Sequence, residues 1–186
     1  MTQGFFQLRR GLFGGIGFIL VLLSACTSTP PKPSDSTLPA HEVKKLQSMR
    51  LSNQLPVPVH QVKRSALKDT WGAARSQGRS HEGIDIIVPR GTKVLSATEG
   101  LVADLRNNNL GGKVIWIMGP AGSWHYYAHL DGHKRGLNVG DYVKKGDVIG
   151  YVGNTGNARH TAPHLHYGIY LGGKGRNAVN PYPYLR

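Results

Sequence analysis

Two short runs of metal-ligating side chains, far apart in the sequence, constrain the fold of this chain more than any other feature. The first run places His81 and Asp85 on either side of Gly83, and the second extends from His164 to His166. Residues four apart on a flat strand lie about 13 Å from each other, whereas the bonds of a metal ion are about 2 Å long. We therefore predict that the backbone curls between His81 and Asp85, and that Gly83, which lacks a Cβ and accepts positive φ, permits the curl.

The second run needs no such bend, because His164 and His166 alternate with Leu165 in a stretch that is typical of a strand. Both imidazoles then face one side, about 6.5–7 Å apart, and Leu165 faces the other. That spacing is too wide for two undistorted bonds to one ion, and it suits one ligand beside one group that acts on bound water. The predicted ligands are His81, Asp85 and one histidine of this run, a set that zinc takes in hydrolytic sites with a fourth position open to water.

Composition favours a β-rich fold. The chain has 186 residues, which suggests one domain with tails, and its 25 Gly and 11 Pro favour many turns over a helical bundle. No helical periodicity is evident after Asp69. Strands are predicted at Ile84–Val88, Lys93–Ala97, Gly100–Leu105, Lys113–Met118, Ser123–Leu130 and Leu165–Tyr170.

The segments around these strands are predicted to be turns, loops and one hairpin. Asn138–Gly153 has the pattern of a glycine-punctuated hairpin, and residues 154–163 form a long loop that leads into the second metal-ligating run. Residues 131–137 are predicted to be a loop. A Pro- and Val-rich strand is expected at Leu55–Val62, where the chain joins the domain. The stretch from His41 to Asn53 is either a short helix or more linker.

A surplus of basic residues gives the chain a formal charge of +13. This charge points to anionic partners such as cell-wall polymers, lipid head groups or nucleic acid, although plain solubility explains it equally well. The sequence has no aromatic-and-basic array and no nucleic-acid motif, so nucleic acid is not expected as a partner. Removal of residues 1–25, which include Arg9 and Arg10, would lower the charge by two, to +11.

Residues 1–25 have the pattern of an export signal. Arg9 and Arg10 supply the positive region, and Gly11 to Leu23 form an apolar core that is too short to span a bilayer comfortably. The signal leads through Leu-Ser-Ala into Cys26, the only cysteine, and this run resembles the lipobox of bacterial lipoproteins. The resemblance implies that Cys26 is lipidated and becomes the new N-terminus. An uncleaved anchor and an ordinary secretory signal with a chance cysteine are the alternatives.

The residues that follow Cys26 indicate a tether. Residues 26–54 begin with a Ser-, Thr- and Pro-rich stretch that cannot bury a core and would hold a domain off a membrane surface. Thr27 follows the cysteine, whereas an aspartate there would favour retention at the inner membrane of two-membrane bacteria. We therefore expect a lipid-anchored protein of the cell envelope, located at the outer membrane and facing the periplasm.

Three motifs occur in a fixed order along the rest of the chain. They are His81-x-Gly83-x-Asp85, then Tyr127-Ala128-His129-Leu130, then Gly153-x-Thr155-Gly156 leading to His164-Leu165-His166. The set closely resembles the M23 metallopeptidases, the lysostaphin and LytM-like group that cuts peptides in bacterial cell walls, over about Leu55 to Tyr170. The resemblance implies an all-β fold: a single antiparallel β-sandwich of duplicated hairpins over residues 55–175, followed by a C-terminal tail, 176–186.

The resemblance also assigns roles to individual residues. His81, Asp85 and His166 match the family's ligands to one zinc ion per chain, and His129 and His164 match its two second-row histidines. In that family the second-row histidines orient and deprotonate the water on the metal, or steady the tetrahedral intermediate. Zinc brings the pKa of its water to about 7, and a neighbouring imidazole titrates near that pH, so no serine or cysteine nucleophile is needed.

Other residues with catalytic potential are set aside. Glu82 is a candidate general base because it follows a histidine, as in HExxH zinc proteases. That motif, however, needs a second histidine at the position that Asp85 occupies. By alternation His125 shares a strand face with Tyr127 and His129 and would line the same groove, yet a hydrogen-bonded role away from the site is preferred. The same plain interpretation applies to His41, His60, His133 and His160.

The leading hypothesis is a zinc-dependent endopeptidase that hydrolyses peptide cross-links of bacterial peptidoglycan. Its second partner would be a membrane, bound through the lipid on Cys26. The alternative from another class is a non-catalytic LytM-like activator of a cell-wall amidase. Such regulators have usually lost ligands, whereas this chain keeps the full set. A third alternative is a structural lipoprotein that tethers the wall to the membrane. The sequence does not indicate which peptide bond is cut.

Overall fold

The computed structural model describes residue 1 and residues 38–185, except for the side chain of Gln77. Apart from residue 1, the predicted export signal therefore lies outside the described residues, as do Cys26 and part of the predicted tether. Among the residues that are described, no helix is long and apolar enough to cross a membrane.

Antiparallel strands are the main regular secondary structure of the described chain, which confirms the prediction of a β fold. Valine, isoleucine and aromatic residues are frequent in β4 and β8, as expected for side chains on a pleated surface. The strands are β1 (Ile84–Ile87), β2 (Lys93–Leu95), β3 (Gly100–Asn108), β4 (Gly112–Met118), β5 (Trp124–His133), β6 (Tyr142–Val143), β7 (Val148–Val152), β8 (His164–Tyr170) and β9 (Ala178–Val179). The helices are α1 (Ala40–Ser48) and the short 3-10 turns η1 (Arg64–Ala66), η2 (Ser76–Gly78), η3 (Pro120–Gly122), η4 (Gly156–Ala158) and η5 (Tyr182–Leu185).

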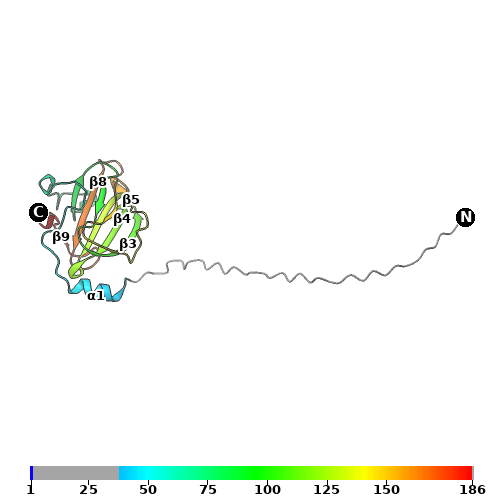
Figure 1. Ribbon diagram of the computed structural model, residues 1–186. Helices are drawn as coiled ribbons and strands as arrows, with labels where there is room; N and C mark the ends of the chain where they lie inside the picture. Colours follow the sequence, from blue (N-terminus) through cyan, green and yellow to red (C-terminus); the bar gives the residue numbers. More distant parts are fainter. Residues whose placement is uncertain (2–37, 186) are drawn as a thin grey trace. The chain divides into compact units, whose positions relative to one another are not determined.

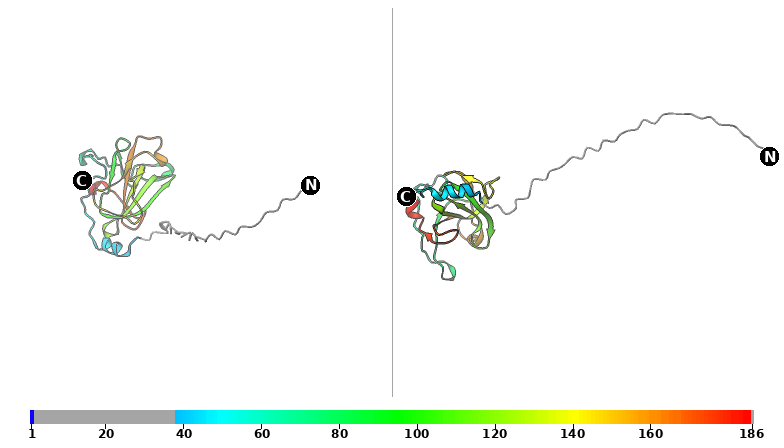
Figure 2. Two further views of the ribbon diagram at one scale, coloured as in Figure 1. Left: turned by 45° about the vertical axis from the view of Figure 1, so that its right-hand side comes forward. Right: turned by 90° about the horizontal axis from the view of Figure 1, so that it is seen from below.

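The sheet brings together strands that lie far apart in the sequence (Figures 1 and 2). Its main path runs β1-β8-β5-β4-β3-β6, while β7 pairs with both β2 and β5, and β9 pairs with β8. Asp85 of β1 is opposite His166 of β8, and His166 is opposite Ala128 of β5. Residues opposite one another share a face of the sheet, so strand pairing itself carries the two metal-ligating runs to one place.

The two faces of β8 have different surroundings. Leu165, Tyr167 and Ile169 are 0% exposed and belong to the main hydrophobic core. His164 and His166 are only partly buried and face the other side, as their alternation with Leu165 predicted. A slip of one residue would turn the buried side chains out and the histidines into the core, so burial at about 25 cal/mol per Å² of apolar surface holds the register.

The prediction of a hairpin over Asn138–Gly153 was wrong. The chain does turn there, with the Lys144 N–H donating to an Asp147 carboxylate oxygen at 2.8 Å. The two strands that flank the turn nevertheless do not pair with each other, because β6 pairs with β3 and β7 pairs with β2 and β5.

The strand predicted over Leu55–Val62 was also wrong. Only an isolated bridge forms there, at Val59. Pro56 and Pro58 have no N–H to give to a strand ladder, which explains why pairing does not extend on either side. β5, by contrast, is longer than predicted. It continues to His133 and so includes the start of the predicted loop, residues 131–137.

The compact part of the chain is wider than the predicted peptidase domain, residues 55–175. Before it, α1 settles the open choice between helix and linker. This helix lies at one end of the strands (Figures 1 and 2) and contacts η3, and its Leu46 is 0% exposed. After it, β9 pairs with β8, and Leu185 is 0% exposed in the main core. Both flanks therefore bury apolar surface with the sheet.

Candidate active site

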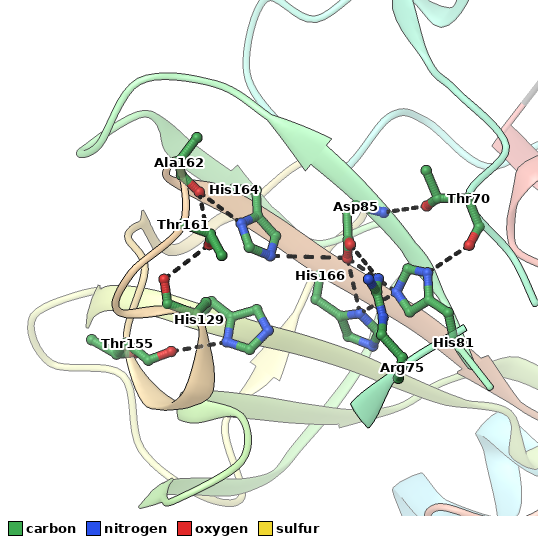
Figure 3. Close-up of polar contacts among 11 residues, drawn as sticks. Thr70, Arg75, His81, Asp85, His129, Thr155, Thr161, Ala162, His164 and His166 are labelled. Atoms are coloured by element: carbon green, nitrogen blue, oxygen red, sulfur yellow. Dashed lines mark hydrogen bonds and ion pairs between the residues drawn. The ribbon is translucent and has the colours of Figure 1, made fainter. Parts of the chain in front are cut away.

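The side chains of His81, Asp85 and His166 point toward one another on the partly exposed face of the sheet (Figure 3). His81 Nε2 lies 2.8 Å from His166 Nδ1 and 3.0 Å from Asp85 Oδ1. His166 Nδ1 lies 3.2 Å from the same carboxylate oxygen. The structure therefore brings the three predicted ligands to a common point.

A divalent ion fits this donor set. A tetrahedral ion with bonds of about 2.0–2.2 Å holds its ligand atoms about 3.3–3.6 Å apart. The separations found here, 2.8–3.2 Å, are close to that range. Two imidazole nitrogens and one carboxylate oxygen also form the kind of set that zinc takes in hydrolytic sites.

Thr70 orients two of the three candidate ligands. The His81 Nδ1–H donates to the Thr70 carbonyl oxygen at 2.6 Å, so the lone pair of His81 Nε2 is directed at the cluster. The Thr70 hydroxyl accepts the backbone N–H of Asp85 at 2.9 Å. Thr70 was not foreseen from the sequence, because no local pattern links a threonine to ligands 11 and 15 residues further on.

Gly83 supplies space rather than a positive φ. Its φ is not in the left-handed region, so that part of the prediction was wrong. A Cβ at Gly83 would lie 2.6 Å from the Tyr167 carbonyl oxygen and 2.7 Å from His166 Cε1. The segment between His81 and Asp85 can pass this close to β8 only without a side chain.

Burial and charge set the protonation of the cluster. Burial by itself raises the pKa of Asp85, but hydrogen bonds and charges from His166 and His81 hold that pKa far below its usual range. Burial lowers the pKa of His166, against the opposing effect of the Asp85 carboxylate. The cluster thus combines an ionised carboxylate with a neutral imidazole, which are the forms that bind a metal ion.

His129 and His164 stand beside the cluster in the same cleft (Figure 3). Their ring centroids are 4.9 Å apart, and His164 Nε2 is 4.0 Å from Asp85 Oδ1. The His129 Nδ1–H donates to the Thr155 carbonyl oxygen at 2.9 Å, and the His164 Nδ1–H donates to that of Ala162 at 2.8 Å. Each ring therefore has an Nε2 lone pair with which it can accept a proton.

The backbone at His129 turns its ring into the cleft. β5 has one extra residue here, since Ile115 is opposite Tyr127 but Lys113 is opposite Leu130, and φ of His129 is 62°. Simple alternation would have put His129 on the core face with Tyr127, so the predicted shared face was wrong. Burial, followed by the charge of a neighbouring histidine, lowers the pKa of His129 to about 4, which keeps the ring neutral at pH 7.

His125 lies on the core face and does not line the cleft, in agreement with the preferred interpretation. It is 0% exposed, with Nε2 3.0 Å from Ser123 Oγ and Nδ1 2.7 Å from the Tyr167 hydroxyl. Burial lowers the pKa of His125 to about 3. The cleft is likewise not lined by His41, His60, His133 or His160.

The cleft has a volume of about 680 Å³ and is walled by residues before β1 and after β7. Arg75, Arg79 and Glu82 contribute to its first wall. Among the described residues, Glu82 makes no hydrogen bond or ion pair with the ligand cluster, whereas Arg75 Nη2 lies 2.5 Å from Asp85 Oδ2. The cleft is large enough to receive a peptide segment beside the cluster.

The comparison with known families decides which proteins share this arrangement. A model described as "Peptidase family M23" matches residues 79–181, a range that holds every candidate ligand and both neighbouring histidines. The chain belongs to peptidase family M23. The resemblance seen in the sequence motifs is confirmed, and the fold is that of M23 enzymes of the lysostaphin type.

Individual M23 relatives show how far the similarity extends. The chain is 41% identical over 127 residues to the L-Ala–D-Glu endopeptidase of Bacillus subtilis (strain 168), covering 64% of this chain and 39% of that protein. It is 35% identical over 101 residues to the peptidoglycan DD-endopeptidase ShyC of Vibrio cholerae, covering 54% of this chain and 22% of ShyC. The chain thus spans well under half the length of these curated relatives.

A solved M23 structure matches the fold. The catalytic domain of the antimicrobial peptidase lysostaphin from Staphylococcus simulans superposes with a TM-score of 0.59 at 31% identity. The match covers 66% of this chain and 94% of that domain. The shared part of the fold is therefore a nearly complete M23 catalytic domain.

Proposed function

We propose that this M23 chain is a zinc-dependent endopeptidase that hydrolyses peptide cross-links of bacterial peptidoglycan. The observation that carries the proposal is the convergence of His81, Asp85 and His166 on one point, beside the imidazoles of His129 and His164 in one cleft. The substrate class is supported by the names of the relatives, an L-Ala–D-Glu endopeptidase and a peptidoglycan DD-endopeptidase.

Zinc bound to this cluster would lower the pKa of a water molecule to about 7 and polarise the scissile carbonyl. In the proposed mechanism, His129 Nε2 accepts the proton of the attacking water. The Thr155 carbonyl oxygen, which accepts from His129 Nδ1–H, steadies the imidazolium that forms. His129 can then return the proton to the leaving amine.

We assign to His164 the role of stabilising the negative charge that develops on the substrate. Its Nδ1–H is held by Ala162, and its Nε2 lies 4.0 Å from Asp85 Oδ1, at the rim of the cluster. When protonated at Nε2, His164 can donate a hydrogen bond to the carbonyl oxygen as it becomes negative. Loss of one such donor typically costs about 10²–10³ in rate.

We also propose that the chain is held at the membrane through a lipidated Cys26 after removal of residues 1–25. The stretch from 26 to the start of α1 then serves as a tether at the outer membrane, facing the periplasm. The support is the run of residues around Cys26 and the charge of +11 that remains after removal of residues 1–25, which favours contact with anionic polymers and head groups.

The peptidase proposal is tested with isolated cell walls. The full chain, purified in detergent, is expected to release soluble peptides from peptidoglycan, and a chelator is expected to stop the release because the water is no longer activated. His166→Ala should abolish the release, since it removes a ligand. Mass spectrometry of the fragments identifies the bond that is cut.

The matched control is His60→Ala, which removes an exposed histidine outside the cleft and should leave the release unchanged. Full activity of His166→Ala would end the assignment. If the chain binds zinc but releases fragments only when a cell-wall amidase is added, the activator alternative is the correct one.

A further inference from the structure

A single cation contacts the candidate ligand cluster within the described residues. Arg75 Nη2 lies 2.5 Å from Asp85 Oδ2. The other oxygen of the same carboxylate, Oδ1, lies 3.0 Å from His81 Nε2 and 3.2 Å from His166 Nδ1 (Figure 3). The two oxygens of Asp85 are therefore directed to different partners.

The backbone holds Arg75 and His81 on the two arms of one small hairpin. Ala74 and Ser80 form an isolated antiparallel bridge, and the His81 N–H donates to the Ala73 carbonyl oxygen at 2.9 Å. The Arg75 N–H donates to the Arg79 carbonyl oxygen at 2.8 Å. The hairpin that places a candidate ligand thus also places the guanidinium next to the second ligand.

We propose that Arg75 is a positioning residue that holds Oδ2 of Asp85 and so presents Oδ1 alone to the metal ion. The inference rests on the proposed zinc site. A carboxylate that bound through both oxygens would occupy two positions around the ion. With Oδ2 held by Arg75, the cluster supplies three ligand atoms and leaves the fourth tetrahedral position to water.

Arginine suits this task better than lysine would. Its planar guanidinium is always charged and offers several N–H donors in a fixed fork, so one of them can hold Oδ2 in a defined direction. The side chain of Arg75 is 37% exposed and that of Asp85 is 19% exposed, so the contact lies at the cleft wall.

Two accounts of Arg75 predict opposite signs for metal affinity. If Arg75 acted only as a nearby positive charge, its removal would relieve repulsion and tighten the binding of a dication. If it positions the carboxylate, its removal frees Asp85 to rotate and weakens binding. Loss of an outer partner of a metal ligand typically costs about 10–100-fold in metal affinity.

The test measures zinc affinity of the full chain by competition with a chromophoric chelator. We expect Arg75→Ala to weaken zinc binding about 10–100-fold, and Arg75→Lys to recover only part of the loss, because a lysine restores the charge without the fork. The matched control is Arg79→Ala, which removes the same charge from the same hairpin. The only hydrogen bond of the Arg79 side chain in the described structure is to Ser76 Oγ, so zinc affinity should not fall.

A second measurement reports the coordination geometry of the bound metal ion rather than its affinity. The chain loaded with Co²⁺ should show the intense visible absorption of a four-coordinate ion, and Arg75→Ala should weaken it as Asp85 becomes bidentate. Circular dichroism of each metal-free variant checks folding, and Arg75→Gln replaces Arg75→Ala if the latter does not fold. Unchanged or tighter zinc binding in the folded Arg75 variants would overturn the proposal. Absence of zinc binding in the unaltered chain would instead overturn the proposed metal site itself.

Discussion

At the scale of single residues, two histidines that are close in the sequence have different roles because their side chains have different surroundings. His125 and His129 both lie on β5, and burial lowers the pKa of each. The ring of His129 lies in the cleft because its left-handed backbone turns it there. His125 has both ring nitrogens within hydrogen-bond distance of buried hydroxyls, those of Ser123 and Tyr167, and so belongs to the core.

The buried His125 leads to a prediction about acid stability. Its pKa is about 3 in the folded chain and about 6.5 when unfolded, so the unfolded state binds more protons between these values. Stability from this residue is therefore complete above pH 6.5 and is lost as the pH falls toward 3, by up to about 1.4 kcal/mol per pH unit. Replacing it by glutamine, His125→Gln, should make the free energy of unfolding depend less steeply on pH.

Urea unfolding at pH 7, 5.5 and 4.5 measures this slope for the full chain. The exposed His60 provides the control, because His60→Gln removes a histidine without removing a buried one. Parallel pH dependences for His125→Gln and the unaltered chain would contradict the prediction.

At the scale of elements, the candidate site depends on the packing of the segment before β1 against β8. Gly83 lies where a Cβ would meet the Tyr167 carbonyl oxygen at 2.6 Å and the His166 ring at 2.7 Å. The strand pairing sets this distance, since Asp85 and His166 are opposite one another in the β1–β8 ladder. A change at Gly83 therefore acts on the spacing between two candidate ligands.

We expect Gly83→Ala to lower both stability and peptide release. The added methyl must push the chain away from β8, which costs about 1–3 kcal/mol for a tight site and separates His81 from His166. Gly132→Ala is the matched control, because a Cβ at Gly132 has no neighbour within 4 Å and its φ is not in the left-handed region. Thermal unfolding and fragment release from cell walls compare the two variants. Equal behaviour of the two alanine variants would show that the close approach at Gly83 is not needed.

At the scale of the whole described molecule, segments outside the sheet take part in the same fold. α1 contributes Leu46, which is 0% exposed, and the C-terminal turn η5 contributes Leu185, which is 0% exposed in the main core. Lys45 of α1 also lies over the ring of Tyr142, 5.6 Å from its centroid. α1 is thus a packed part of the unit that carries the cleft.

Leu46→Ala is expected to destabilise the chain by about 2–5 kcal/mol, the usual cost of emptying a buried leucine site. The loss should show as a lower melting temperature in a single transition, because α1 unfolds with the sheet. Lys44→Ala, an exposed position of the same helix, should change the melting temperature little. If Leu46→Ala melts like the unaltered chain, α1 is not part of the cooperative unit.

Much of the candidate site was predictable because it depends on local pattern. The alternation of His164, Leu165 and His166 determined which side chains share a face, since the period of a strand is two residues. The glycine between His81 and Asp85 was rightly singled out, although for close approach rather than for its φ. The ordered motifs also indicated the M23 family, which the comparisons confirmed.

Only the tertiary structure decided which segments became neighbours. The residues around Asn138–Gly153 turn as their glycines suggest, but each flanking strand found a partner elsewhere in the sheet. Thr70 and Arg75 hold the ligand cluster through contacts that leave no local signature, and the inward turn of His129 arises from one extra residue in a ladder. Periodicity along a chain fixes the side to which a residue points, whereas its neighbours depend on long-range pairing, and that pairing is settled only when the whole core packs.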